Sequence, residues 1–238
     1  MEWREQNGSR WLEAELPGAR AVFTTRLGGV SAGPFESLNL GMKTADEGDR
    51  VRENRRRASA ALGIEPERVL MGHQVHGAEL AWHEAPQSPS PFAELLPADQ
   101  QVDAHATATP GLAAMVQVAD CLPIALVGER GVAMVHGGWR GLAAGIVGNA
   151  AEAVGATAAA IGPGIGPCCY EVGDEVLDAF DDLDEVATGY MLDLSAVAQA
   201  QLNAAGVSDS ARGIGTEGRR SAQPARALRG SGQPCSTD

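Results

Sequence analysis

The chain has 238 residues, enough for one large domain or two small ones with a sizeable buried core. Its 18 Lys and Arg against 31 Asp and Glu give a net charge of −13, which argues against nonspecific binding to nucleic acid or to an anionic membrane. No signal peptide, membrane span or disulfide scaffold is visible in a chain with only four Cys, so we expect a soluble, cytoplasmic protein.

Short apolar runs alternate with glycine- and proline-rich segments in the first part of the chain. Residues 20–25 predict a strand, and residues 26–41 form a Gly-rich loop. The charge-rich residues 46–63 fit a surface helix. Residues 68–82 predict strand structure interrupted by glycines, and residues 84–99, with four prolines, predict a long loop.

The second part of the chain mixes strands with helices. Three apolar runs at residues 112–119, 124–127 and 131–136 indicate hairpin-like strands. Apolar residues four apart predict one helix over residues 140–154. The remaining elements are a strand, a tight loop and two weaker helices, over residues 157–161, 162–167, 174–180 and 194–205. This mixture favours an α+β or α/β domain.

The C-terminal segment differs in composition from the rest of the chain. Residues 1–211 carry a net charge of −16, whereas residues 212–238 carry +3. From Thr216 onward the chain has one large aliphatic residue and no aromatic one, so it cannot bury enough apolar area to offset its ordering entropy. We therefore expect a single working domain over residues 1–215 and a divergent, disordered tail over residues 216–238.

Three segments place a metal-capable side chain at a predicted strand end beside Gly or Pro. They are QVHG, ADCLP and VHGGWRG, which contribute His76, Cys121 and His136. Two neutral imidazoles and a thiolate would form a three-ligand zinc site with an open fourth position, which a catalytic zinc requires. The ligand spacing matches no local zinc-finger pattern. The alternative interpretation is that the histidines are structural and Cys121 is a buried apolar residue.

Neighbouring polar residues are less suitable as ligands of such a site. On a strand, His73 would face away from His76, and Asp120 would face away from Cys121, so neither is expected to share their metal. Arg140 is expected either to anchor an anion or to pair with a carboxylate.

Two further features border the predicted site. Arg26 opens the Gly-rich loop, and a guanidinium beside flexible backbone N–H groups suits phosphate or carboxylate. Cys168 and Cys169 are adjacent, which suits neither zinc chelation nor an ordinary disulfide. We expect their loop to close the pocket, and a catalytic thiol is the alternative.

Taken together, five segments resemble the laccase-domain family, first described as multicopper polyphenol oxidase and later as purine nucleoside phosphorylase. The similarity covers about residues 20–207, in the family's order. The segments are FTTRLGGVSAGPFESLNLG (23–41), HQVHG (73–77), DAHATATPGLAAMVQVADCLPIAL (103–126), VAMVHGGWRGLAAGI (132–146) and IGPGIGPCCYEVGDEV (161–176).

The resemblance implies an α+β fold, built as a four-layer α/β/β/α sandwich with mixed sheets. It implies zinc held by His76, Cys121 and His136, with Arg26 completing the catalytic residues as a contact to phosphate or to the sugar. It also implies phosphorolysis of adenosine, inosine, guanosine and methylthioadenosine, together with hydrolytic deamination of adenosine. The expected partners are a purine nucleoside and phosphate, with no nucleic acid and no membrane. The sequence carries no signal for an oligomeric state.

The C-terminus departs from the family, because the strand expected beyond Gly215 is absent. This departure motivates a catalytically impaired scaffold protein as one alternative function. A copper-dependent polyphenol oxidase is the other, since one Cys and two His can bind copper. Multicopper oxidation, however, needs many more than the five His of this chain.

Overall fold

The computed structural model describes residues 1–207 and 209–212. The divergent tail predicted over residues 216–238 lies outside this part of the chain, as does the boundary predicted at residue 215. Within the described residues, no helix is both long and apolar enough to cross a membrane.

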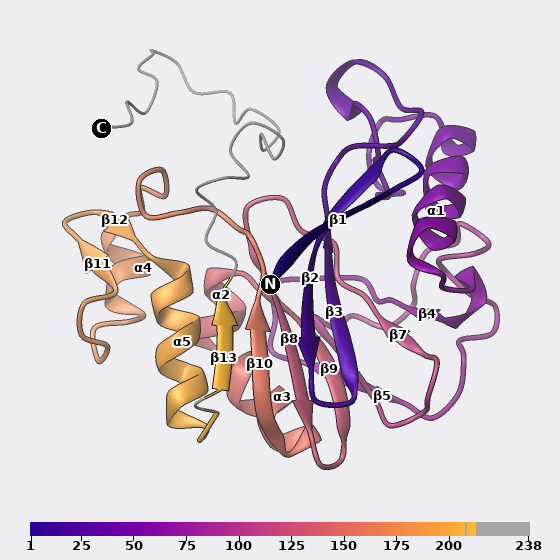
Figure 1. The fold of residues 1–238 in the computed structure, drawn as a ribbon. Helices are drawn as coiled ribbons and strands as arrows, with labels where there is room; N and C mark the ends of the chain where they lie inside the picture. The colour runs from indigo at the N-terminus through magenta and orange to yellow at the C-terminus, as the bar shows by residue number, and fades with distance from the viewer. Residues whose placement is uncertain (208, 213–238) are drawn as a thin grey trace.

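A six-stranded mixed sheet forms the centre of the molecule (Figure 1). Its strand order is β13-β10-β8-β9-β6-β5. The four central strands pair antiparallel, and the outermost strand at each edge pairs parallel with its neighbour. The strands are β5 (Leu80–His83), β6 (Ala104–Thr107), β8 (Leu122–Gly128), β9 (Gly131–Gly137), β10 (Ala156–Ile161) and β13 (Asp209–Arg212). The hairpin predicted from the apolar runs is the β8–β9 pair, joined by a two-residue turn.

A second sheet packs on one face of the first. Its three antiparallel strands are β1 (Glu2–Gln6), β2 (Ser9–Leu16) and β3 (Ala19–Thr24), the last confirming the strand predicted at residues 20–25. Asn7 and Gly8 connect β1 to β2 with φ of 53° and 77°, the positive values that a tight hairpin turn requires. Apolar residues of both sheets form the interface, namely Leu12, Ala14, Ala21, Phe23, Ala125 and Ala160.

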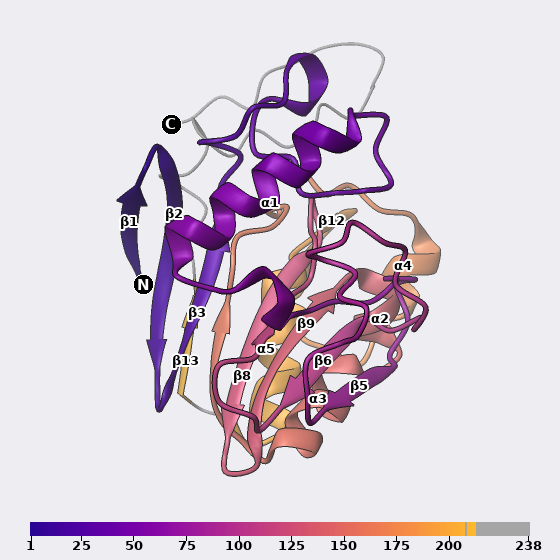
Figure 2. The same cartoon turned by 90° about the vertical axis from the view of Figure 1, so that its right-hand side faces the viewer.

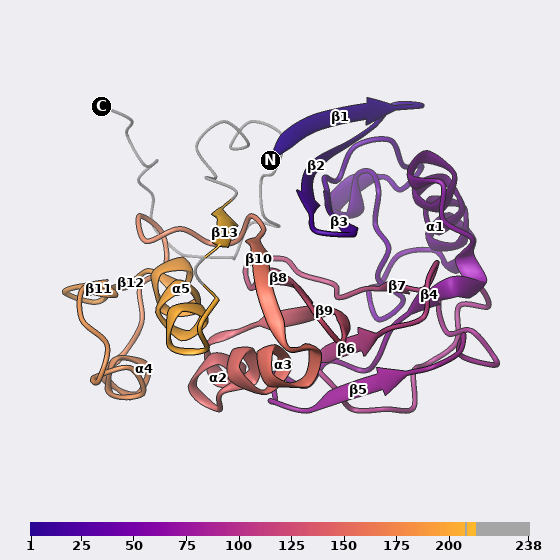
Figure 3. The ribbon, with the colours of Figure 1, turned by 60° about the horizontal axis from the view of Figure 1, so that its bottom comes forward.

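Helices pack against each of the two sheets. The helices α2 (Trp139–Ala143), α3 (Ile146–Val154) and α5 (Leu194–Ala204) pack on the six-stranded sheet. On the opposite side, α1 (Gly48–Leu62) packs against β2 of the second sheet. Figures 2 and 3 show the second sheet stacked on the six-stranded sheet, with α2 and α3 on the far side of the latter and α1 beside the second sheet. The predicted α+β sandwich with mixed sheets is therefore confirmed.

The helix predicted over residues 140–154 is wrong in one respect, because it is two helices. Gly145 has a φ of +83° and separates α2 from α3. The predicted apolar face is nevertheless correct on both sides of the break, since Leu142, Ile146, Ala150 and Val154 have no solvent exposure. The apolar pattern therefore indicates which side is buried, but a left-handed glycine interrupts the backbone hydrogen bonding.

The strand predicted at residues 112–119 is also too long. Only β7 (Ala113–Ala114) is a strand there, and it pairs in parallel with β4 (Val69–Leu70). The other short elements are the 3₁₀ turns η1 (Gly33–Phe35) and η2 (Pro66–Arg68), helix α4 (Asp174–Asp178), and strands β11 (Ala187–Thr188) and β12 (Met191–Leu192).

A buried pair of histidines joins the edge strand β5 to its neighbour β6. Nε2 of His83 lies 3.1 Å from Nδ1 of His105. His105 has no solvent exposure, and its Nε2 has no hydrogen-bond partner among the described residues. Burial and then the charge of His83 lower the pKa of His105 to about 4, against a smaller opposing effect of Asp103. Burial also lowers the pKa of His83. Both rings are therefore neutral at pH 7.

This pair makes the stability of the fold pH-dependent. The pKa of His105 is about 4 in the folded chain and 6.5 in an unfolded one, so the unfolded chain binds more protons between these values. We expect stability to be complete above pH 6.5 and to fall by up to about 3 kcal/mol as the pH drops towards 4. Urea unfolding at pH 7.5, 5.5 and 4.5 measures this loss. A His105→Gln variant should show a shallower dependence, and an equally steep one would contradict the assignment.

Candidate metal centre

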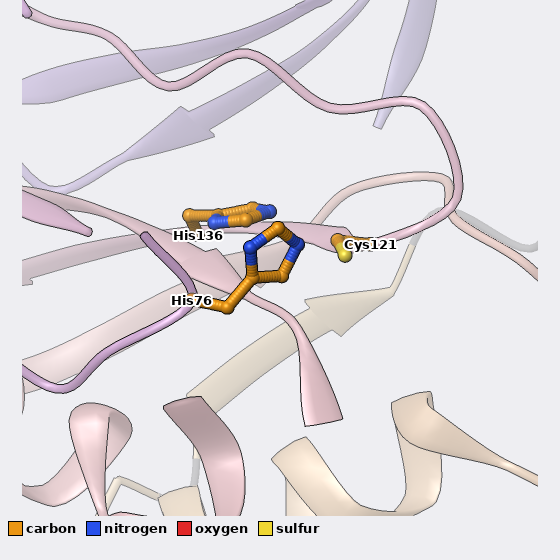
Figure 4. A group of neighbouring side chains, drawn as sticks. All are labelled: His76, Cys121 and His136. Atoms are coloured by element: carbon orange, nitrogen blue, oxygen red, sulfur yellow. The ribbon is translucent and has the colours of Figure 1, made fainter. Parts of the chain in front are cut away.

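The fold brings the three predicted ligands together from three separate segments. His76 lies in the loop between β4 and β5, Cys121 directly precedes β8, and His136 lies on β9. The potential ligand atoms of the three side chains all lie within 4.8 Å of one another. Figure 4 shows the two imidazoles and the thiol gathered at one point. The rings of His76 and His136 meet edge to face, with centroids 4.8 Å apart.

The cluster is open to solvent on one side. His136 is buried at its base, Cys121 is half-buried, and His76 is exposed. The β8–β9 register places Pro123 opposite His136 and Leu122 opposite Gly137, so Cys121 lies beside the end of β9. The exposed His76 is therefore the solvent-facing side of the cluster.

Asp103, immediately before β6, holds the cluster in place. It is fully buried, and its carboxylate accepts a 2.7 Å hydrogen bond from Nδ1 of His136. It also accepts the backbone N–H groups of Val75, His76 and Gly77 at 3.0, 2.9 and 2.8 Å. The three amide bonds fix the turn in which His76 has a φ of +62°. The bond to Nδ1 leaves Nε2 of His136 as its ligand atom.

Sequence reasoning missed this role of Asp103. The residue is the first of a quoted family segment, but nothing in its immediate neighbourhood marks it. The one available signal is an acidic residue directly before the apolar strand β6, where an unpaired carboxylate would be costly to bury.

Burial determines the protonation of the donors. It lowers the pKa of His136, against the opposing effect of Asp103, so the imidazole is neutral and able to ligate. Burial raises the pKa of the Cys121 thiol, as do the carboxylates of Asp120 and Asp103. The thiol is therefore protonated near neutral pH in the metal-free protein, and metal binding would release its proton.

The donor set fits a divalent transition metal. Two imidazoles and one thiol, within reach of one another and open on one side, match a three-ligand site with a vacant coordination position. The carboxylate of Asp103 behind His136 is the outer partner that metal-ligating histidines normally have. His76, Cys121 and His136 could therefore hold one metal ion.

Because Gly138 has no side chain, His76 and Cys121 can occupy the space beside it. A Cβ at this position would lie 2.9 Å from Cδ2 of His76 and 3.2 Å from Sγ of Cys121. Its backbone, with φ −79° and ψ 156°, is open to any residue, so the contact alone excludes a side chain.

We expect Gly138→Ala to displace His76 and to weaken metal binding about 10- to 100-fold, the range seen when support of a ligand is lost. Competition with a chelator measures the affinity. Gly148→Ala is the control, because nothing lies within 4 Å of its Cβ. Gly148 lies inside α3, so that variant should keep its metal and gain roughly 0.5–1 kcal/mol of stability. Equal metal affinity in the two variants would rule out the proposed contact.

Arg26 contributes to the shape of the Gly-rich loop. Its guanidinium donates hydrogen bonds to the carbonyl oxygens of Glu36 and Pro34. Its own carbonyl accepts the backbone N–H groups of Ser37 and Leu38. The loop is thus closed on itself around Arg26. Contact between Arg26 and phosphate or sugar stays a prediction.

The remaining predicted residues lie outside the three-ligand group. His73 is not on a strand, so the argument from strand alternation was wrong for it, although it does not join the group. The loop carrying Cys168 and Cys169 is tied to the Cys121 segment, because the N–H of Ile165 donates to the carbonyl of Asp120 at 2.7 Å. The two exposed sulfurs lie 2.6 Å apart.

Comparisons with known proteins agree with this architecture. Residues 20–221 match the family described as multi-copper polyphenol oxidoreductase laccase. A purine nucleoside phosphorylase of Streptomyces coelicolor is 41% identical over 210 residues, which cover 82% of this chain and 84% of that protein.

Two solved structures share the fold. YlmD of Geobacillus stearothermophilus superimposes with a TM-score of 0.76 at 35% identity, covering 88% of this chain and 86% of that one. A hypothetical protein YfiH of Bacillus licheniformis gives a TM-score of 0.79 at 27% identity, covering 89% and 87%. With a family match over most of its length and relatives of this similarity, the chain belongs to the multi-copper polyphenol oxidoreductase laccase family.

Proposed function

We propose that the protein is a zinc-dependent purine nucleoside phosphorylase. The observation that carries the proposal is the solvent-open group of His76, Cys121 and His136 in a chain 41% identical to a protein named purine nucleoside phosphorylase. We propose adenosine, inosine, guanosine and methylthioadenosine as substrates, and hydrolytic deamination of adenosine as a second activity of the same site.

In phosphorolysis a phosphate oxygen attacks the anomeric carbon while the bond from that carbon to the purine nitrogen breaks. The purine leaves with the bonding electrons and takes up a proton. Zinc bound at the three ligands would supply Lewis acidity, which polarises a substrate oxygen or activates water. Asp103 keeps Nε2 of His136 directed at the cluster, and its amide bonds keep His76 in place. Arg26 and the Gly-rich loop would orient the phosphate.

The donor set supports zinc over a multicopper centre. Among the described residues, one group of three donors comes together, and two of the five histidines are paired in the buried His83–His105 contact. A multicopper oxidase needs further histidine ligands around additional ions.

One experiment separates the candidate functions. Metal content is measured on the full chain purified without added metal, together with release of adenine or hypoxanthine with and without phosphate. Zinc with phosphate-dependent release is the expected result. Copper with oxidation of phenols would replace the proposal by the polyphenol oxidase, and zinc without turnover would favour a catalytically impaired scaffold.

A further inference from the structure

The first turn of α2 lies directly against the metal-ligand cluster. A Cβ at Gly138 would meet His76 and Cys121, as described above, and a Cβ at Gly141 would lie 2.7 Å from the carbonyl oxygen of Gly77. Gly138 and Gly141, both within four residues of the end of β9, thus pack closely against the segments that carry His76 and Cys121. A side chain on the solvent side of this turn is therefore at the rim of the cluster.

Arg140 is the charged residue on that turn, and it is exposed. Its guanidinium carbon lies 4.3 Å from the centre of the Trp139 ring, so the side chain rests on an indole face. Within residues 1–207 and 209–212, no carboxylate lies within ion-pair distance of Arg140. The sequence left open whether this arginine pairs with a carboxylate, and in the described chain it does not.

The nearby carboxylates of Asp103 and Asp120 form no ion pair with Arg140. The Asp103 carboxylate is committed to three backbone amides and to His136. Tyr170 lies near both Arg140 and the Cys121 segment, because burial and Cys121 raise its pKa, Arg140 lowers it and Asp120 raises it. A positive charge held on an aromatic face near a candidate metal site, and not ion-paired to any carboxylate of the described residues, suits an anionic co-substrate.

We propose that Arg140 binds the phosphate co-substrate at the rim of the metal-ligand cluster, in addition to Arg26. This inference rests on the proposed phosphorylase function for the identity of the anion. The two arginines then have different tasks. Arg26 donates to carbonyl oxygens of its own loop and shapes it, whereas Arg140 offers a planar, bidentate donor pair to the phosphate.

The test compares Arg140→Gln, Arg140→Lys and Arg52→Gln in the zinc-loaded full chain. Arg52 lies on α1, in the opposite outer layer, and its ion pair with Asp49 is exposed. We expect Arg140→Gln to raise the KM for phosphate about 10- to 100-fold, as the loss of charge-assisted hydrogen bonds implies, with little change in the KM for inosine. Arg140→Lys should recover part of the loss, and Arg52→Gln should match the wild type.

A second measurement needs no turnover. Inorganic phosphate added without nucleoside should change the Trp139 fluorescence, because it engages the guanidinium stacked on that indole. The change should be absent in Trp139→Phe and should require higher phosphate concentrations in Arg140→Gln. Unaltered phosphate dependence in Arg140→Gln, in either assay, would overturn the inference. If the wild type lacks phosphorolysis, the proposed function fails, while the fluorescence titration still decides whether Arg140 binds phosphate.

Discussion

Replacing Cys121 with Ala is expected to abolish metal retention and nucleoside turnover together. The variant leaves two imidazoles and removes the thiolate, so the loss in metal affinity should exceed the roughly 10- to 100-fold cost of disturbing an outer partner. Cys121 is only half-buried and precedes β8 rather than lying within it, so the fold should survive. Inductively coupled plasma mass spectrometry gives the metal content, and phosphate-dependent release of hypoxanthine from inosine gives the turnover.

The control for this variant is Cys168→Ala, a matched substitution of an exposed cysteine outside the three-ligand group. It should retain one metal ion per chain. Full phosphorolysis in Cys121→Ala would contradict both the ligand assignment and the metal dependence of the reaction.

Asp103→Ala is expected to be the most destabilising of the proposed substitutions. It leaves three backbone N–H groups and Nδ1 of His136 without their acceptor. At roughly 1–3 kcal/mol for each buried donor left unsatisfied, the loss amounts to several kcal/mol. This is a large fraction of the roughly 5–15 kcal/mol that stabilises a typical domain. Urea unfolding at pH 7.5 measures the change.

Two companion variants separate positioning from simple destabilisation. Asp103→Asn keeps one acceptor oxygen, as an amide carbonyl, and nearly the same shape, so it should fold better than Asp103→Ala yet bind metal about 10- to 100-fold more weakly than the wild type. Asp49→Ala removes an aspartate whose side chain is 96% exposed, and it should change stability by no more than about 0.5 kcal/mol. Wild-type stability and metal content in Asp103→Ala would show that the carboxylate does not hold the site.

The chemistry of the side chains was enough to single out the three candidate metal ligands. His76, Cys121 and His136 stood beside glycines and prolines at predicted strand ends, and these short segments need no long-range information to be noticed. That the three side chains lie close together in space could not be derived from these short segments. It depends on the pairing of β8 with β9 and on a loop held from another strand, and both are contacts between residues far apart in the sequence.

Two further local features of the fold are readable in the sequence. The Asn7–Gly8 pair between alternating apolar and polar residues is a strong signal for a two-residue hairpin, and it would have predicted β1 and β2. Gly145 inside an apolar helical pattern indicated a possible break between α2 and α3. The role of Asp103 is different, since its four donors come from residues 26 to 33 positions away along the chain.

The Asp103 carboxylate also bears on the kinetics of folding. It can accept from the His76 loop and from His136 only after β6 has paired with β9 and the loop has closed over their ends. We therefore expect the ligand group to assemble late in folding, so that a metal ion needing all three donors would not act as a folding nucleus. Interactions absent from the transition state slow unfolding and leave the folding rate nearly unchanged. Metal loading should accordingly lengthen the lifetime of the native protein.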